Sequence, residues 1–109
     1  MKISELKCKL GLELLTDDNF CDREVTGCYI GDLLSWVMGK ASSQDAWITI
    51  MNNINIVAVA ALTDVSCIIL CEGVDAEKEI IDKANFQGIV ILKSENTAYE
   101  LACKISGEI

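Results

Sequence analysis

The segment Asp22–Met38, with the sequence DREVTGCYIGDLLSWVM, decides the fold because it changes from a strand pattern to a helix pattern. Its first part, Glu24–Ile30, contains the β-branched and aromatic residues that favour strands. Asp32 follows as a predicted N-cap, and the residues after it are mostly apolar up to Gly39, which ends the predicted helix. This segment therefore predicts a strand that leads directly into a helix, the first half of a β-α-β unit.

The same alternation of strand and helix continues along the chain. Later strands are predicted at Ala46–Met51, Cys67–Cys71 and Ile89–Leu92, and a short earlier strand at Leu12–Leu15. Strands joined by helices form right-handed parallel crossovers, so we predict one α/β domain over residues 1–109, with a mostly parallel five-stranded sheet and helices on both faces. The first strand can pair antiparallel, because only a short turn separates it from the second. The predicted helix caps are Ser4, Asp32, Asn52 or Asn53, Asp75, and Asn96 or Thr97, and Gly11 is predicted to end the first helix.

Composition limits the partners of this protein. The chain has 109 residues, of which 51% are hydrophobic, and a formal net charge of −8. A domain of this size cannot hide all of its apolar surface, so we expect a partner, most simply a second copy of the chain in a homodimer. The acidic excess argues against nucleic acid and anionic membranes, which both attract clusters of Lys and Arg. No apolar run is long enough to span a membrane, and the first residues lack the apolar core of a signal peptide, so we expect a cytoplasmic protein.

The chain has six cysteines and no histidine. No two cysteines have the C-x-x-C spacing of metal sites, and Cys67 and Cys71 lie in an apolar run that favours buried thiols. Metal or cluster ligation and disulfides stay open as alternatives. Without histidine, the commonest general base and zinc ligand is missing. We therefore predict no cofactor, no metal and no catalytic residue.

Two predicted helices are apolar around most of their circumference. They follow Asp32 and Asn53, and neither keeps the polar stripe that is typical of a helix with one solvent-exposed face. We expect one or both to form a homodimer interface, and the alternative is that the first and last helices cover them within the chain. The candidate interface residues are Leu33, Leu34, Trp36, Val37, Met38, Ile54 and Val57.

Polar residues follow the predicted strands, at the edge where open parallel sheets bind ligands. Helix capping explains several of them equally well, so both interpretations stay open. The nucleotide-binding patterns G-x-G-x-x-G and G-x-x-x-x-G-K-[ST] are absent. A carboxylate at Asp32 would repel a phosphate, whereas the helix start at Asn52 and Asn53 suits an anion. The candidate ligand-binding residues at this edge are Gly31, Asp32, Asn52, Asn53, Glu72, Lys93 and Ser94.

Four further ligand-binding candidates lie just before or within the second predicted strand, Glu24–Ile30. Asp22 and Arg23 either clamp a ligand or form a local salt bridge. Thr26 and Gly27 follow, and a glycine within a strand usually marks a bulge or the close approach of a ligand or another backbone. The sequence leaves the ligand and the structural interpretations open for all four.

The same segment resembles the signature of the DRTGG domain family, and the resemblance covers essentially the whole chain. Asp22, Arg23, Thr26 and Gly27 fit the named positions, and Cys28 stands where the family has its second glycine. The resemblance implies a domain found beside CBS pairs in regulated pyrophosphatases, within phosphate acetyltransferases, and similar to the N-terminal domain of HPr kinase/phosphorylase. The P-loop half of that kinase is missing here, and the family defines no catalytic residue.

Two functions follow as hypotheses. The first is a non-catalytic regulatory or scaffold module, homodimeric, that senses a small metabolite or nucleotide or binds a protein partner. The second is a redox or metal accessory protein that uses Cys28, Cys67 or Cys71. This second hypothesis follows from the resemblance, which extends to stand-alone copies near iron-only hydrogenase genes.

Overall fold

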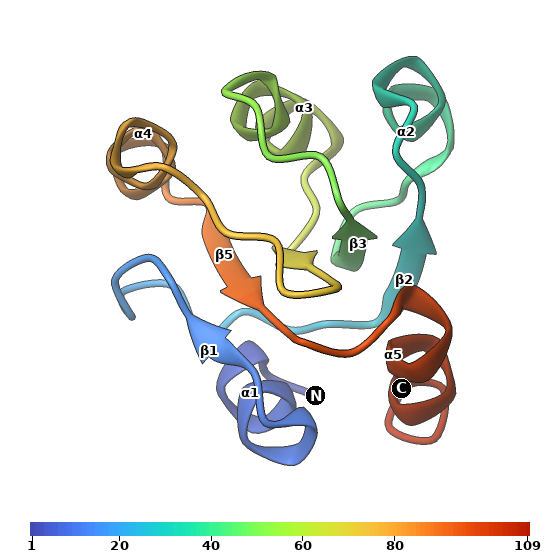
Figure 1. Ribbon diagram of the computed structural model, residues 1–109. Helices are drawn as coiled ribbons and strands as arrows, with labels where there is room; N and C mark the ends of the chain where they lie inside the picture. The colour runs from blue at the N-terminus through green and yellow to red at the C-terminus, as the bar shows by residue number, and fades with distance from the viewer.

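The computed structural model describes residues 1–109 as five helices and five strands (Figure 1). In chain order these are α1 (Ile3–Leu10), β1 (Glu13–Leu14), β2 (Gly27–Ile30), α2 (Leu34–Lys40), β3 (Asp45–Thr49), α3 (Asn55–Thr63), β4 (Cys67–Leu70), α4 (Lys78–Gln87), β5 (Val90–Lys93) and α5 (Ala98–Ile105). The strands form one sheet in the order β1-β5-β4-β3-β2. The sheet is mixed, because β2 to β5 are parallel and β1 is antiparallel to β5, not to its sequence neighbour β2. None of the helices is long and apolar enough to cross a membrane.

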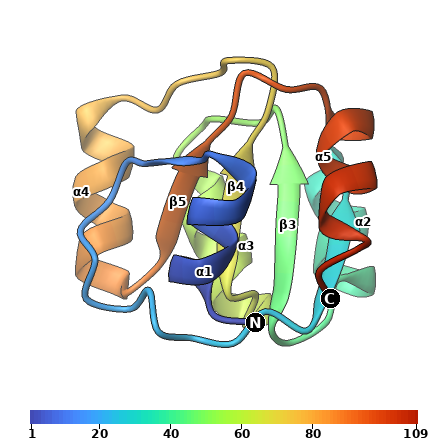
Figure 2. The ribbon, with the colours of Figure 1, turned by 90° about the horizontal axis from the view of Figure 1, so that it is seen from below.

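Two apolar clusters lie on opposite sides of the sheet. α1 and α5 lie on one side, in front of the strands in Figure 2, and α2, α3 and α4 lie on the other side (Figure 1). Leu101 of α5 packs with Ile69 of β4 in the first cluster, and Ile56 of α3 packs with Trp47 of β3 in the second. Every residue of β3 and β4 is buried, which explains why β4 lies in a continuous apolar run of the sequence.

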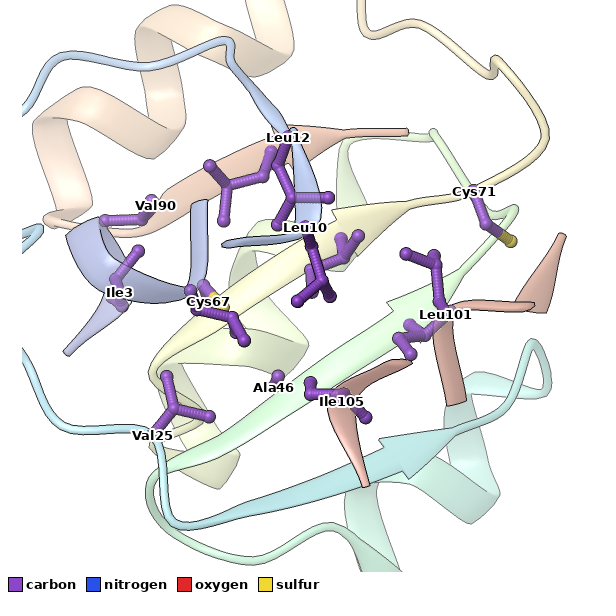
Figure 3. Close-up of a cluster of buried hydrophobic side chains, with 14 of the residues drawn as sticks. Ile3, Leu10, Leu12, Val25, Ala46, Cys67, Cys71, Val90, Leu101 and Ile105 are labelled. Carbon is purple, nitrogen blue, oxygen red and sulfur yellow. The ribbon is translucent and has the colours of Figure 1, made fainter. Parts of the chain in front are cut away.

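The two cysteines of the apolar run around β4 point to the same cluster. Cys67 and Cys71 are buried on the side of the sheet that α1 and α5 cover, together with Leu101 and Ile105 (Figure 3). Their separation of four residues along an extended chain places them on one face, as predicted. Both thiols therefore act as small apolar side chains in the core.

Two helix ends agree with the predictions, and of the two caps left open for the last helix the structure has Thr97. Thr97 caps α5, where its hydroxyl accepts a hydrogen bond from the Glu100 N–H at 3.2 Å. Gly11 ends α1 in the left-handed conformation, with φ of 65°. The start of α1 was predicted two residues too late, because Ser4 is inside the helix and Lys2 is the N-cap.

The other three predicted caps do not coincide with the N-cap positions, although the Asn53 side chain accepts a hydrogen bond from the Asn55 N–H at the start of α3. α2 begins after Leu33, α3 after Ile54 and α4 after Glu77, and none of these N-cap residues contributes a side-chain hydrogen bond. Asp32 and Asp75 form hydrogen bonds to other segments instead. Competition from tertiary hydrogen bonds therefore displaced the helix starts by one or two residues from the positions that local cap preferences indicate.

Candidate functional site

The candidate ligand-binding residues lie at two opposite ends of the strands. Because β2 to β5 are parallel, residues that precede the strands share one edge and residues that follow them share the other. Asp22, Arg23, Thr26 and Gly27 lie at the amino edge, and the remaining candidates lie at the carboxyl edge. The structure therefore does not bring them into a single cleft.

Arg23 holds the turn between α3 and β4. Its guanidinium donates hydrogen bonds to the carbonyl oxygens of Asp64 at 3.4 Å and Val65 at 3.2 Å, and it pairs with the Asp64 carboxylate at 3.1 Å. Asp64 has a left-handed backbone with φ of 60°, a conformation that non-glycine residues seldom adopt. A hydrogen bond from the Ser43 hydroxyl, together with the Arg23 charge, lowers the pKa of Asp64. These contacts give Arg23 a structural role, while Asp22 lies exposed beside it.

Gly27 leaves room for a buried carboxylate at the start of β3. A Cβ atom at position 27 would lie 2.5 Å from Oδ1 of Asp45. Asp45 is buried, and its Oδ2 accepts a hydrogen bond from the Ser42 N–H at 2.8 Å. The close approach that the sequence predicts at Gly27 is therefore to a neighbouring side chain of the same chain.

At the carboxyl edge, Asp32 ties the start of α2 to the end of β3. Its Oδ1 accepts hydrogen bonds from the Thr49 hydroxyl at 2.8 Å and from the Ile50 N–H at 3.0 Å. The preceding residue, Gly31, accepts a hydrogen bond from Nε1 of Trp47 at 2.9 Å. Asp32 thus acts as a connector between two segments, in place of the helix cap that the sequence predicts.

The polar groups at the ends of β3 and β5 both bind Asp75, in the loop after β4. Nζ of Lys93 forms an ion pair with Asp75 at 3.2 Å, and Nδ2 of Asn52 donates to the Asp75 carbonyl oxygen at 2.8 Å. The hydrogen bond between the charged groups lowers the pKa of Asp75 and raises that of Lys93. Asn53 accepts a hydrogen bond from the Asn55 N–H at 2.9 Å. A ligand at this edge would have to compete with these internal contacts.

Glu72 and Ser94 lie where the loops after β4 and β5 join. The N–H of Glu72 donates to the Asn96 carbonyl oxygen, and the N–H of Gly73 donates to the Ser94 carbonyl oxygen, both at 2.8 Å. Ser94 is buried, and its hydroxyl accepts a hydrogen bond from the Asn96 N–H at 3.0 Å. Both residues therefore stabilise loop structure.

A groove of about 530 Å³ opens between β2 and α5, and sequence reasoning did not predict it. The groove exists because α5, the last helix of the chain, lies beneath the first parallel strand (Figure 1). The sequence offered one signal for it: the C-terminal lining residues are three, one and three residues apart, a spacing that places side chains on one side of a helix. The lining residues are Thr26–Ile30, Ala102, Ile105, Ser106 and Ile109.

The inner cysteines are poor candidates for thiolate chemistry. Burial raises the pKa of Cys67 to about 12 and that of Cys28, beside the groove, to about 11. Thiols with such pKa values stay protonated at neutral pH, whereas the thiolate is the form that binds metals and attacks electrophiles. No group of three or more His, Cys, Asp or Glu side chains converges in a geometry that could hold a metal ion.

The candidate interface residues differ in their exposure. Leu33, Trp36 and Met38 are 61%, 59% and 43% exposed. Val37 and Val57 are completely buried within the chain, so these two residues cannot contact a partner, and their assignment to an interface is corrected here. The candidates that are half-buried against the same core are Leu34 and Ile54.

Comparison with known proteins identifies the family. The family model of the DRTGG domain matches residues 5–107. The chain belongs to the DRTGG domain family. No curated protein matches this DRTGG domain in sequence.

A solved structure shares the fold of this DRTGG domain. It is the crystal structure of the CBS and DRTGG domains of the regulatory region of Clostridium perfringens pyrophosphatase, complexed with the activator diadenosine tetraphosphate. The superposition has a TM-score of 0.74 at 17% sequence identity, and it covers 95% of this chain and 45% of that chain. This DRTGG domain therefore spans less than half of the pyrophosphatase regulatory chain.

The structure explains two positions of the DRTGG motif without a ligand. Arg23 fixes the turn that precedes β4, and Gly27 admits the Asp45 carboxylate. Cys28, at the position of the second glycine, lines the groove and packs against the cluster covered by α1 and α5. In this DRTGG domain, Arg23 and Gly27 join neighbouring strands at their amino edge, and Cys28 forms part of the groove.

Proposed function

We propose that this DRTGG domain is a non-catalytic, cytoplasmic regulatory module that acts as a homodimer. The observation that carries the proposal is an exposed apolar surface on α2, here called the α2 patch, formed by Leu33, Trp36 and Met38. α2 packs against α3 on one flank, and no helix lies on its other flank (Figure 1). Covering three large apolar side chains supplies a favourable free energy of association, and an ordinary dimer buries about 800 Å² per partner.

The charge distribution around α2 also supports contact between two copies. Two chains of net charge −8 repel each other unless their interface is poor in acidic groups. Between Val25 and Gly39 the only charged residue is Asp32, whose carboxylate already accepts two hydrogen bonds. The next charge is Lys40, whose Nζ lies 5.0 Å from the centre of the Trp36 ring. The α2 patch is therefore the part of the surface that two acidic chains can bring together.

The side chains present support a regulatory role over a catalytic one. The chain has no histidine, and the carboxylates of Asp32, Asp64 and Asp75 accept hydrogen bonds from groups of the same chain. The raised pKa values of Cys28 and Cys67 argue against the thiol-based accessory function. The related regulatory region of a pyrophosphatase gives a precedent for a DRTGG domain in regulation.

Substitution of Trp36 by glutamate is expected to weaken the dimer by roughly 30-fold, because it removes a large apolar contact and places two like charges at the interface. Sedimentation equilibrium over a range of concentrations measures this change. Leu62→Glu is the matched control, since Leu62 is 73% exposed at the end of α3, outside the α2 patch. Equal dissociation constants for Trp36→Glu and the unmodified chain would show that the α2 patch is not the interface.

The proposal includes a small metabolite or nucleotide as the regulatory ligand, bound at the carboxyl edge, where Lys93 provides a cation that it would exchange from Asp75 to an anionic group of the ligand. A ligand at a hundred times its dissociation constant stabilises the fold by about 2.7 kcal/mol. For a domain of this size, this stabilisation raises the midpoint of thermal unfolding by roughly 10 °C. A thermal-shift screen with diadenosine tetraphosphate, AMP, ATP and acetyl phosphate tests this expectation, with Lys93→Ala as the variant that should lose the shift. If none of these compounds raises the midpoint, ligand sensing at this edge is wrong, while dimerisation is unaffected.

A further inference from the structure

The two edge strands of the sheet differ in how they are protected against pairing with another strand. β1 consists of only two residues, one of which is the charged Glu13. β2 has four residues, Gly27–Ile30, with no charge and no proline, and its outer edge has no strand partner. Proteins usually block such edges with a charge, a proline or a covering segment. β2 therefore presents backbone N–H and C=O groups that can bind an extended chain.

The groove between β2 and α5 lies directly beside this free edge. Its lining combines the strand residues Thr26–Ile30 with the apolar side chains of Ile105 and Ile109. Side chains of an added strand alternate between two sides, so one set would enter the groove and the other would face the side of α2. The unpaired backbone selects an extended peptide, and the groove selects apolar side chains at alternate positions.

The charges around β2 indicate the flanking residues of such a peptide. The strand itself is uncharged. Glu24 precedes it, but its carboxylate forms an ion pair with the N-terminal ammonium group at 2.9 Å. Asp32 follows the strand, is exposed and has no cationic partner. We propose that the free edge of β2 and the groove beside α5 form a docking site for an extended segment of a partner protein, with apolar residues at alternate positions and a basic residue at the end that lies beside Asp32. This site would connect the regulatory module to the protein that it controls, and it does not depend on the α2 patch.

The position of α5 favours a peptide segment over a second copy of this chain. A two-fold axis between paired β2 strands would place them about 4.8 Å apart. α5 lies beneath β2, so the same two-fold axis would bring the two α5 helices towards each other (Figure 1). Packed helices need about 8–10 Å between their axes. A segment without a helix beneath it can approach the edge, whereas the α5 helices of two copies would collide.

The test is an NMR titration of the full chain with three eight-residue peptides in which valine and threonine alternate. The first peptide has lysine at both ends, and the second has glutamate at both ends. The third has lysine at both ends and a proline in the centre. The lysine-flanked peptide is expected to shift the amide signals of residues 26–30 and 102–109. The glutamate-flanked peptide, which brings like charges together, should bind roughly tenfold more weakly than the lysine-flanked one. The peptide with a central proline, which lacks one backbone N–H for pairing with β2, should also bind roughly tenfold more weakly. Ile109→Glu, in the groove, should weaken binding by roughly tenfold, and Leu62→Glu should leave it unchanged.

Three results would overturn this inference. The first is no amide shift with any peptide at millimolar concentration. The second is equal binding of the lysine-flanked peptide to Ile109→Glu and to the unmodified chain. The third is dissociation of a dimer when the peptide is added, which would show that a second copy occupies the β2 edge. The Trp36→Glu variant separates this inference from the proposed dimer, because it should remain able to bind the peptide as a monomer.

Discussion

Replacing Trp47 with alanine is expected to lower the free energy of unfolding by about 3–5 kcal/mol, the cost of removing a large aromatic side chain from a packed core. Trp47 is completely buried in the middle of β3, within the cluster that α2, α3 and α4 cover. Its Nε1 also donates the 2.9 Å hydrogen bond to the Gly31 carbonyl oxygen, just before Asp32 and α2. The substitution would therefore loosen the segment that positions the α2 patch as well as the core.

Urea unfolding followed by circular dichroism measures this loss. Trp47→Phe is the control, because it keeps a buried aromatic ring and removes the hydrogen-bond donor. Leaving the Gly31 carbonyl oxygen without its partner is expected to cost about 1–2 kcal/mol. Equal losses for the alanine and phenylalanine variants would mean that the hydrogen bond, and not the packing of the ring, dominates the role of Trp47.

Gly27→Val is expected to lower the free energy of unfolding by about 2–4 kcal/mol, because overpacking next to a buried carboxylate forces that group away from its partner. The added Cβ would lie 2.5 Å from Oδ1 of Asp45, and Asp45 is buried with its other oxygen bonded to the Ser42 N–H. The adjacent β2–β3 pairing would be strained at its first residue pair, Gly27 and Asp45.

A second glycine provides a control for this prediction. No atom lies within 4 Å of a Cβ placed on Gly39, which is in α2. Gly39→Ala is therefore expected to raise stability by about 0.5–1 kcal/mol, through the greater helix propensity of alanine. Combining Gly27→Val with Asp45→Ala should recover part of the loss, since the two residues share one contact. Simple addition of the two separate losses would contradict the role assigned to Gly27.

The parts of the fold that depend on local patterns were predictable from the sequence. The apolar run Cys67–Cys71 indicated a strand buried on both faces, and Gly11 and Thr97 marked helix ends, because each of these signals involves only neighbouring residues. The partner of β1 was not predictable, since Glu13 and Leu14 pair with residues that lie far along the chain. Local pattern carries no information about which distant strand completes the sheet.

The candidate site was less predictable for the same reason. Asp32 has the residue type and position of a helix cap, but its carboxylate bonds to Thr49 and Ile50, which the fold brings alongside. Arg23 was assigned either to a ligand or to a salt bridge, and the structure shows its contacts with Asp64 and Val65. The groove depends on α5 lying beneath β2, and the spacing of the lining residues at the C-terminal end of the chain does not indicate which strand they face.

The molecular mass of the chain in solution tests the central claim most directly. Sedimentation equilibrium at micromolar concentration is predicted to give twice the chain mass of 11.9 kDa, with the mass falling towards that of one chain in the Trp36→Glu variant and not in Leu62→Glu. A mass of one chain for the unmodified protein at that concentration would contradict the account, because the α2 patch would then remain uncovered in solution.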